Sequence, residues 1–180
     1  MNPRIQELTS YLNTGRMSLR EAVEAIPAEM RNQAPGSRQW SVAQVLEHLA
    51  IVENRFTKVL GEKLAAARAG GLGVETATSS ILGSWDVTPM LDRTEKREAP
   101  EAVRPQGIDW NVALAQLDDA RKRFLAVYQS GDGLALVDVI HSHPRFGDLN
   151  MYQWAVWLGS HEARHTEQIR EIEARLKSEV

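Results

Sequence analysis

Residues 150–177 read NMYQWAVWLGSHEARHTEQIREIEARLK, and their apolar side chains recur at the spacing of one helix face. That face consists of Met151, Trp154, Leu158, His161, His165, Ile169, Ile172 and Leu176. Because positions i and i+4 of a helix lie on the same side one turn apart, the imidazoles of His161 and His165 are predicted to point into the core together. Buried polar groups require partners, so this helix predicts a polar site inside the protein.

A second histidine-bearing helix is predicted to begin after Ser41, because Gln44 stands three residues later and completes a capping box. The pattern predicts that this helix continues to about residue 60 or beyond, until Gly70 ends it. His48 lies two turns after the start, on the apolar face. The other members of that face are Val45, Leu49, Val52, Phe56 and Val59. A third inward imidazole is therefore expected on a different helix.

Two further long helices are predicted over residues 3–28 and 110–128, where apolar residues again recur with the helical period. Two shorter apolar segments, residues 80–93 and 134–140, are interpreted as short helices, and residues 141–147 as a loop. No alternating runs flank an Asn-Gly or Asp-Gly turn, so no β-hairpin is expected.

Four principal helices and one long crossover, residues 70–109, predict an all-α four-helix bundle in a single domain over residues 1–180. A chain of 180 residues is long enough for one sizeable core. Helix bundles commonly hold metal sites between their helices. Long connections often serve a function, so we expect residues 70–109 to border the site.

The composition limits the classes of partner. The formal net charge is −3 and the Lys and Arg residues are scattered, so no nucleic-acid partner is expected. No signal-peptide pattern and no run of eighteen apolar residues occurs, which predicts a cytoplasmic protein without a membrane partner. There are no cysteines, so any metal must be held by His, Asp or Glu.

The three inward histidines, His48, His161 and His165, have two interpretations. A single core histidine is usually hydrogen-bonded to a neighbouring carbonyl or carboxylate, and a lone H-x-x-x-H pair often arises by chance. Three imidazoles from two helices of one bundle are better explained by a shared divalent metal ion. Such a site keeps open coordination positions for water, a thiolate or a substrate oxygen, and both Zn²⁺ and Ni²⁺ suit imidazole ligands.

Two other patterns are set aside. The stretch His161-Glu-Ala-Arg-His165 matches the H-E-x-x-H motif of zinc proteases, but only residues 166–180 follow it, with no further domain to form a cleft. We interpret this match as coincidental. His141 and His143 form an H-x-H pair, which we expect to structure a loop rather than to bind the metal.

Two polar side chains are candidates for catalysis. Arg55 follows His48 by seven residues on nearly the same face, where it would steer an anionic substrate, although a surface arginine packing its aliphatic stem is the commoner case. Gln168 follows His165 by three residues and is placed to orient a ligand imidazole or a water molecule.

These features, in this order, resemble the DinB/YfiT-like superfamily over nearly the whole chain. The resemblance is carried by Trp40-Ser41 opening a helix that continues to Glu47-His48-Leu49, by Arg97-Glu-Ala-Pro100 with Pro105-Gln-Gly107, by His143-Pro-Arg-Phe-Gly147, by Gln153-Trp154, and by His161-Glu-Ala-Arg-His165-Thr-Glu-Gln168-Ile169. It implies an up-down-down-up bundle, a divalent metal site at His48, His161 and His165, and a homodimer.

Proteins of this family include transferases that use low-molecular-weight thiols such as bacillithiol or mycothiol, and a maleylpyruvate isomerase. The resemblance implies a metal-dependent enzyme, either a transferase or a hydrolase, that activates such a thiol or a water toward a small-molecule substrate. The absence of cysteine fits a thiol that arrives as a cofactor. Two alternatives stay open: a non-catalytic, stress-related metal- or ligand-binding bundle, and a metal-free bundle whose imidazoles are satisfied by their neighbours.

Overall fold

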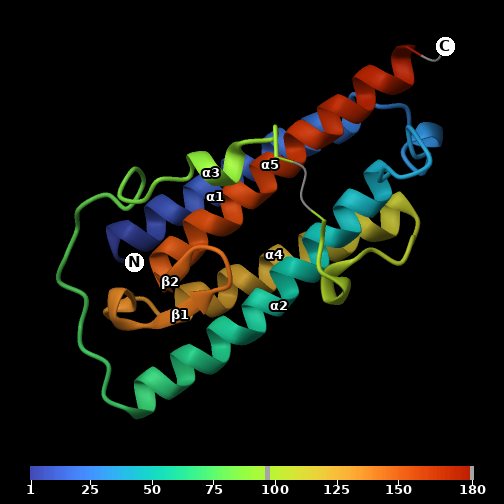
Figure 1. The fold of residues 1–180 in the computed structure, drawn as a ribbon. Helices are drawn as coiled ribbons and strands as arrows, with labels where there is room; N and C mark the ends of the chain where they lie inside the picture. The colour runs from blue at the N-terminus through green and yellow to red at the C-terminus, as the bar shows by residue number, and fades with distance from the viewer. Residues whose placement is uncertain (96–97, 179–180) are drawn as a thin grey trace.

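The computed structural model describes residues 1–95 and 98–178, and it is mostly helical with one small two-stranded sheet (Figure 1). Its long helices are α1 (Pro3–Glu24), α2 (Val42–Ala69), α4 (Trp110–Ser130) and α5 (Met151–Ser178). α1 packs mainly against α5 and α2 mainly against α4, and the two pairs run in opposite directions in Figure 1. No helix among the described residues is long and apolar enough to cross a membrane.

The short elements lie in the connections. They are the 3-10 turns η1 (Ala28–Met30), η2 (Glu101–Val103) and η3 (Leu136–Asp138), the single turn α3 (Thr88–Leu91), and the strands β1 (Ile140–His143) and β2 (Gly147–Asn150). Within the crossover of residues 70–109, Arg97, which begins one of the sequence motifs, lies outside the described residues.

The ends of the long helices follow local chemistry. The capping box predicted at Ser41 is confirmed: its side-chain oxygen accepts from the Gln44 amide at 3.2 Å, and the Gln44 side chain accepts from the Ser41 amide at 3.0 Å. α2 ends at Gly70, as predicted. α1 ends at Glu24 rather than near residue 28, because Pro27 disfavours helical backbone in the residue before it.

Three sequence predictions were wrong. Residues 80–93 contain only the single turn α3, because Gly83 adopts a φ of +82° and Pro89 can enter a helix only at its start. Residues 134–140 form η3 and the beginning of β1 rather than a helix. Residues 141–147, predicted as a loop with no β-hairpin, belong to an antiparallel hairpin, in which His143 pairs with Gly147 and Gly147 supplies the positive φ of the turn. The fold is therefore not purely α-helical.

Four charged side chains divide the hydrophobic core into two clusters, and each long helix contributes one of them: Arg16, Glu53, Arg121 and Glu162. On one side lie Leu12, Phe56, Phe124 and Leu158, and on the other lie Leu19, Leu49, Leu117 and Ile169. We call the four charged residues, Arg16, Glu53, Arg121 and Glu162, the charge layer. Its members are between 1% and 7% exposed.

The charge layer contains two positive and two negative side chains that bind one another directly. Arg16 reaches Glu53 at 3.0 Å and Glu162 at 2.7 Å, and Arg121 reaches Glu162 at 3.0 Å and also binds Glu53. Arg16 also donates to the carbonyl of Leu117 and lies 3.4 Å from the carboxylate of Asp118, and Arg121 donates to the carbonyl of Leu12. Buried charges are tolerated only when paired in this way, so each helix is held at a fixed height relative to the others.

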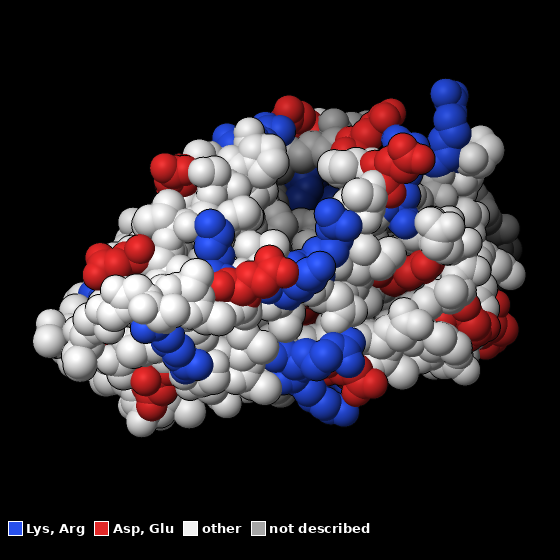
Figure 2. All heavy atoms as spheres, turned by 90° about the horizontal axis from the view of Figure 1, so that it is seen from below, with Lys and Arg blue, Asp and Glu red and all other residues white. Residues whose placement is uncertain are grey.

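On the surface, charged side chains are distributed differently. Figure 2 shows Lys and Arg interspersed with Asp and Glu across one face of the molecule. Exposed pairs such as Lys58–Glu62 on α2 lie 4.0 Å apart and contribute little to stability, because water screens them. The charges that fix the long helices relative to one another are therefore the four in the core.

Replacing Arg121 by Met should lower the free energy of unfolding by about 3–5 kcal/mol, because two buried carboxylates are then left to share the single positive charge of Arg16. The matched control is Arg123→Met on the exposed side of the same helix, where a change within about 1 kcal/mol is expected. Urea denaturation of both variants measures the difference. Equal losses in the two variants would contradict a structural role for the charge layer.

Candidate metal centre

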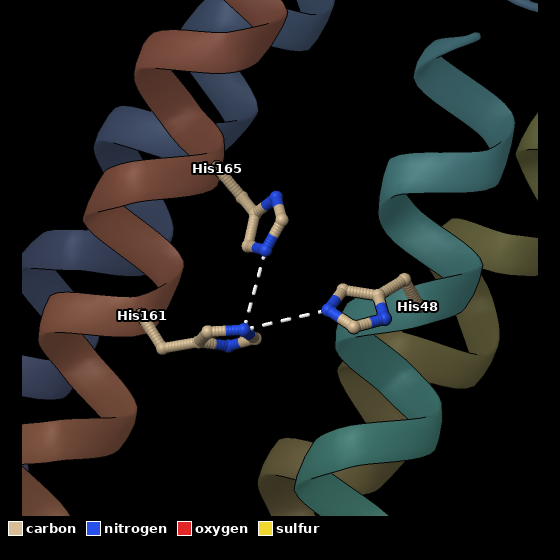
Figure 3. Close-up of side chains that lie close together, drawn as sticks. All are labelled: His48, His161 and His165. Atoms are coloured by element: carbon tan, nitrogen blue, oxygen red, sulfur yellow. Dashed lines mark hydrogen bonds between the residues drawn. The ribbon is translucent and has the colours of Figure 1, made fainter. Parts of the chain in front are cut away.

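The imidazoles of His48 on α2 and of His161 and His165 on α5 converge on one point between the two helices (Figure 3). The Nε2 atom of His161 lies 3.4 Å from Nε2 of His48 and 3.2 Å from Nε2 of His165. All three ligand-type nitrogens lie within 4.8 Å of one another. The structure thus brings together the three histidines that the sequence placed on inward faces.

Two of the three rings are oriented by hydrogen bonds at their other nitrogen. His48 Nδ1 donates to the carbonyl of Val103 at 2.7 Å, and His165 Nδ1 donates to Oε1 of Gln168 at 2.8 Å. Because carbonyl oxygens only accept, both Nδ1 atoms carry the hydrogen and both Nε2 atoms present a lone pair. His161 is held instead by stacking on Trp157, with 5.0 Å between ring centroids and 9° between planes.

The environment keeps all three rings neutral. His48 is 4% exposed, and His161 and His165 are each 8% exposed. Burial lowers the pKa of His48, lowers that of His165 to about 3, and places that of His161 well below its ordinary range. Neutral imidazoles with free lone pairs are the form that binds divalent metals.

The residues present fit a metal ion. Zinc–nitrogen bonds of about 2.0–2.1 Å at tetrahedral angles separate two ligand nitrogens by about 3.3 Å, close to the 3.4 and 3.2 Å measured here. Hydrogen bonding alone does not satisfy the cluster, because Nε2 of His161 carries at most one hydrogen and faces two acceptors. A cation at the centre would satisfy all three lone pairs.

Comparison with known proteins agrees with this geometry. Residues 11–169 match the family model described as the DinB superfamily. The chain belongs to the DinB superfamily. It is also 27% identical over 170 residues, 93% of this chain and 98% of the relative, to the uncharacterized protein YuaE of Bacillus subtilis (strain 168). No solved structure matches it significantly.

In this DinB-superfamily chain, the crossover borders the site, as its length suggested. The carboxylate of Glu47, the residue before His48, accepts from the amides of Gln106 and Gly107 at 2.8 Å each. Gly107 has a φ of +93°, a conformation that glycine adopts readily. The motifs around residues 47 and 107 therefore contact each other directly. This contact holds the crossover so that the Val103 carbonyl lies within hydrogen-bond distance of His48.

A second contact joins the crossover to α5. Arg164, the residue before His165, is 7% exposed and donates to the carbonyls of Met90 at 3.1 Å and Glu95 at 2.9 Å, and also to that of Asp92. Its guanidinium therefore binds three backbone carbonyls of the crossover and ties this segment to α5. Sequence reasoning missed Arg164 and Glu47, although each stands directly before a predicted ligand.

The remaining predicted site residues lie at different distances from the centre. Gln168 binds His165 as described, whereas Arg55 is exposed on α2. Glu162 belongs to the charge layer and binds two arginines, so its carboxylate is not a base for the histidine site. His141 and His143 lie on β1, outside the three-histidine cluster.

Replacing Glu47 by Ala should free the 106–108 backbone from α2, because the amides of Gln106 and Gly107 lose a charged acceptor. We expect hydrogen exchange at those two amides to accelerate by about tenfold or more. The control, Glu62→Ala, removes an exposed carboxylate from the same helix and should leave exchange unchanged. Unchanged protection in the Glu47 variant would refute the role of this carboxylate in holding the 106–108 backbone.

Proposed function

We propose that this chain is a metal-dependent enzyme that activates a low-molecular-weight thiol or a water molecule for transfer to, or hydrolysis of, a small-molecule substrate. The ligands in this proposal are Nε2 of His48, His161 and His165, and the metal is Zn²⁺ or Ni²⁺. The proposal includes the fold that the family resemblance implies, an up-down-down-up bundle of the four long helices, and association into a homodimer.

One observation carries the proposal: three buried, neutral imidazoles bring their Nε2 atoms together at a spacing that suits one cation. Three protein ligands leave coordination positions for an exogenous group, which is typical of catalytic rather than structural sites. A divalent ion in such a site lowers the pKa of a water or thiol that binds to it.

The surrounding residues support this chemistry by fixing the ligands and limiting water. The Val103 carbonyl and Gln168 hold two imidazoles in the tautomer that binds metal. Trp40 packs beside His48, at 5.0 Å between ring centroids, and Trp157 covers one face of His161. These indoles restrict the site to the space between α2 and α5, so a nucleophile and a substrate would meet there with few waters present.

Replacing His161 by Ala should abolish stoichiometric binding of zinc or nickel, because two imidazoles remain and the central one is lost. The matched control is His141→Ala, which removes a histidine outside the cluster and should retain one equivalent of metal per chain. Elemental analysis after dialysis against each metal measures both. Retained stoichiometry in the His161 variant would refute the ligand assignment, and absence of metal from the wild-type protein would favour the metal-free alternative.

The catalytic part of the proposal predicts turnover that depends on the metal. Metal-loaded protein, offered low-molecular-weight thiols together with a panel of electrophiles, and separately offered hydrolysable esters and amides, should convert at least one substrate, and the His161→Ala protein should convert none. If the metal raises the melting temperature but no thiol or substrate binds, the site stabilises the fold and the non-catalytic alternative is correct.

A further inference from the structure

The His143 ring lies next to the metal centre without belonging to it. Its centroid is 5.2 Å from that of Trp157, which in turn stacks on His161 at 5.0 Å. A single indole therefore separates His143 from a ligand imidazole. His143 begins one of the sequence motifs that carry the family resemblance, and neither the ligand set nor the charge layer accounts for it.

The structure fixes which nitrogen of His143 carries the hydrogen. Nδ1 accepts from the backbone amide of Arg145 at 3.0 Å and from that of Phe146 at 3.2 Å. In a neutral ring the hydrogen then resides on Nε2, which acts as a donor. Burial, with smaller contributions from His141 and Arg145, lowers the pKa of His143, so the ring is neutral at pH 7. None of the described residues accepts a hydrogen bond from this Nε2.

The ring is also held in place. It packs against Phe146 at 4.8 Å and Trp154 at 5.3 Å between centroids, and His143 pairs with Gly147 in the hairpin. Trp154 Nε1 donates to the carbonyl of His141 at 2.9 Å, which ties β1 to α5. The side chain remains partly exposed. A half-buried donor with a fixed tautomer and a fixed ring, yet without a protein acceptor, is organised to receive a ligand.

We propose that His143 binds the substrate or thiol cofactor by donating its Nε2–H to an oxygen acceptor of that molecule, a carboxylate being the strongest. The inference rests on the proposed function, because the same molecule would place its reacting group at the three-histidine site and its oxygen at His143. His143 then selects among molecules that the metal site alone would accept equally, since an unpaired donor penalises ligands that lack the acceptor.

The variant that isolates this role is His143→Asn. The Asn Oδ1 accepts backbone amides in turns much as Nδ1 does here, so the hairpin is kept while the Nε2–H is removed. The matched control is His141→Asn on the same strand, where the ring stacks on Trp154 at 5.4 Å instead of contacting Trp157. Zinc content is measured first and should match the wild-type protein in both variants; the melting temperature is measured alongside it to confirm folding, since each variant loses aromatic packing.

The probes are pairs of thiols of equal chain length, one ending in a carboxylate and one in a methyl group: mercaptoacetate, 3-mercaptopropionate and 4-mercaptobutyrate against the corresponding alkanethiols. Calorimetric titration of zinc-loaded protein gives Kd for each. In the wild-type protein at least one carboxylate thiol should bind about tenfold more tightly than its partner. The His143→Asn variant should lose that preference, with the Kd of the alkanethiol unchanged, and the His141→Asn variant should keep it.

Each other outcome has a definite meaning. An equal preference in the wild-type and His143→Asn proteins overturns the inference and leaves the proposed function standing. Loss of zinc, or an equal weakening of both thiols, in the His143→Asn variant shows that the residue supports the metal site, which also overturns the inference. If no thiol binds the zinc-loaded wild-type protein, the thiol form of the proposed function fails and the inference fails with it.

Discussion

The charge layer is the constraint on which the rest of this structure depends. Two arginines and two glutamates from four helices stay buried only while every helix keeps its height, because a shift of one turn would separate the partners of these ion pairs. Glu53 lies five residues after His48, and Glu162 directly follows His161. The network therefore sets how α2 and α5 align, and with it the 3.4 Å between the Nε2 atoms of His48 and His161.

The long helices and the histidine cluster could be predicted because their signals are local. Apolar periodicity places His48, His161 and His165 on inward faces, and the capping box at Ser41 fixes where α2 begins. The charge layer left a weaker signal. In α1 the apolar line is interrupted between Leu12 and Leu19. Glu53, Arg121 and Glu162 interrupt the apolar lines of the other three helices in the same way. They can be recognised as charge partners only by assuming that the helices pack together.

The connections could not be predicted, because contacts distant in sequence determine them. The hairpin of β1 and β2 depends on the positive φ of Gly147 and on the tie between Trp154 and the strand, and no turn signal marks it. The crossover takes its path from Glu47 and Arg164, whose carboxylate and guanidinium bind backbone groups 60 and 74 residues away. Neither residue interrupts the apolar pattern of its own helix, so periodicity alone does not distinguish it from a surface charge, and only its place directly before a predicted ligand marks it.

At the three-histidine site, neighbouring residues of one helix serve different contacts. His48 and His165 face the centre, while the residue before each of them, Glu47 and Arg164, turns to the crossover and holds it. The relative positions of the three histidines are therefore set by the helices, whose apolar periodicity can be recognised in the sequence. Val103 on the crossover and the β1–β2 hairpin instead take their positions from tertiary contacts. This division explains why sequence reasoning reached the three converging histidines and missed the residues that surround them.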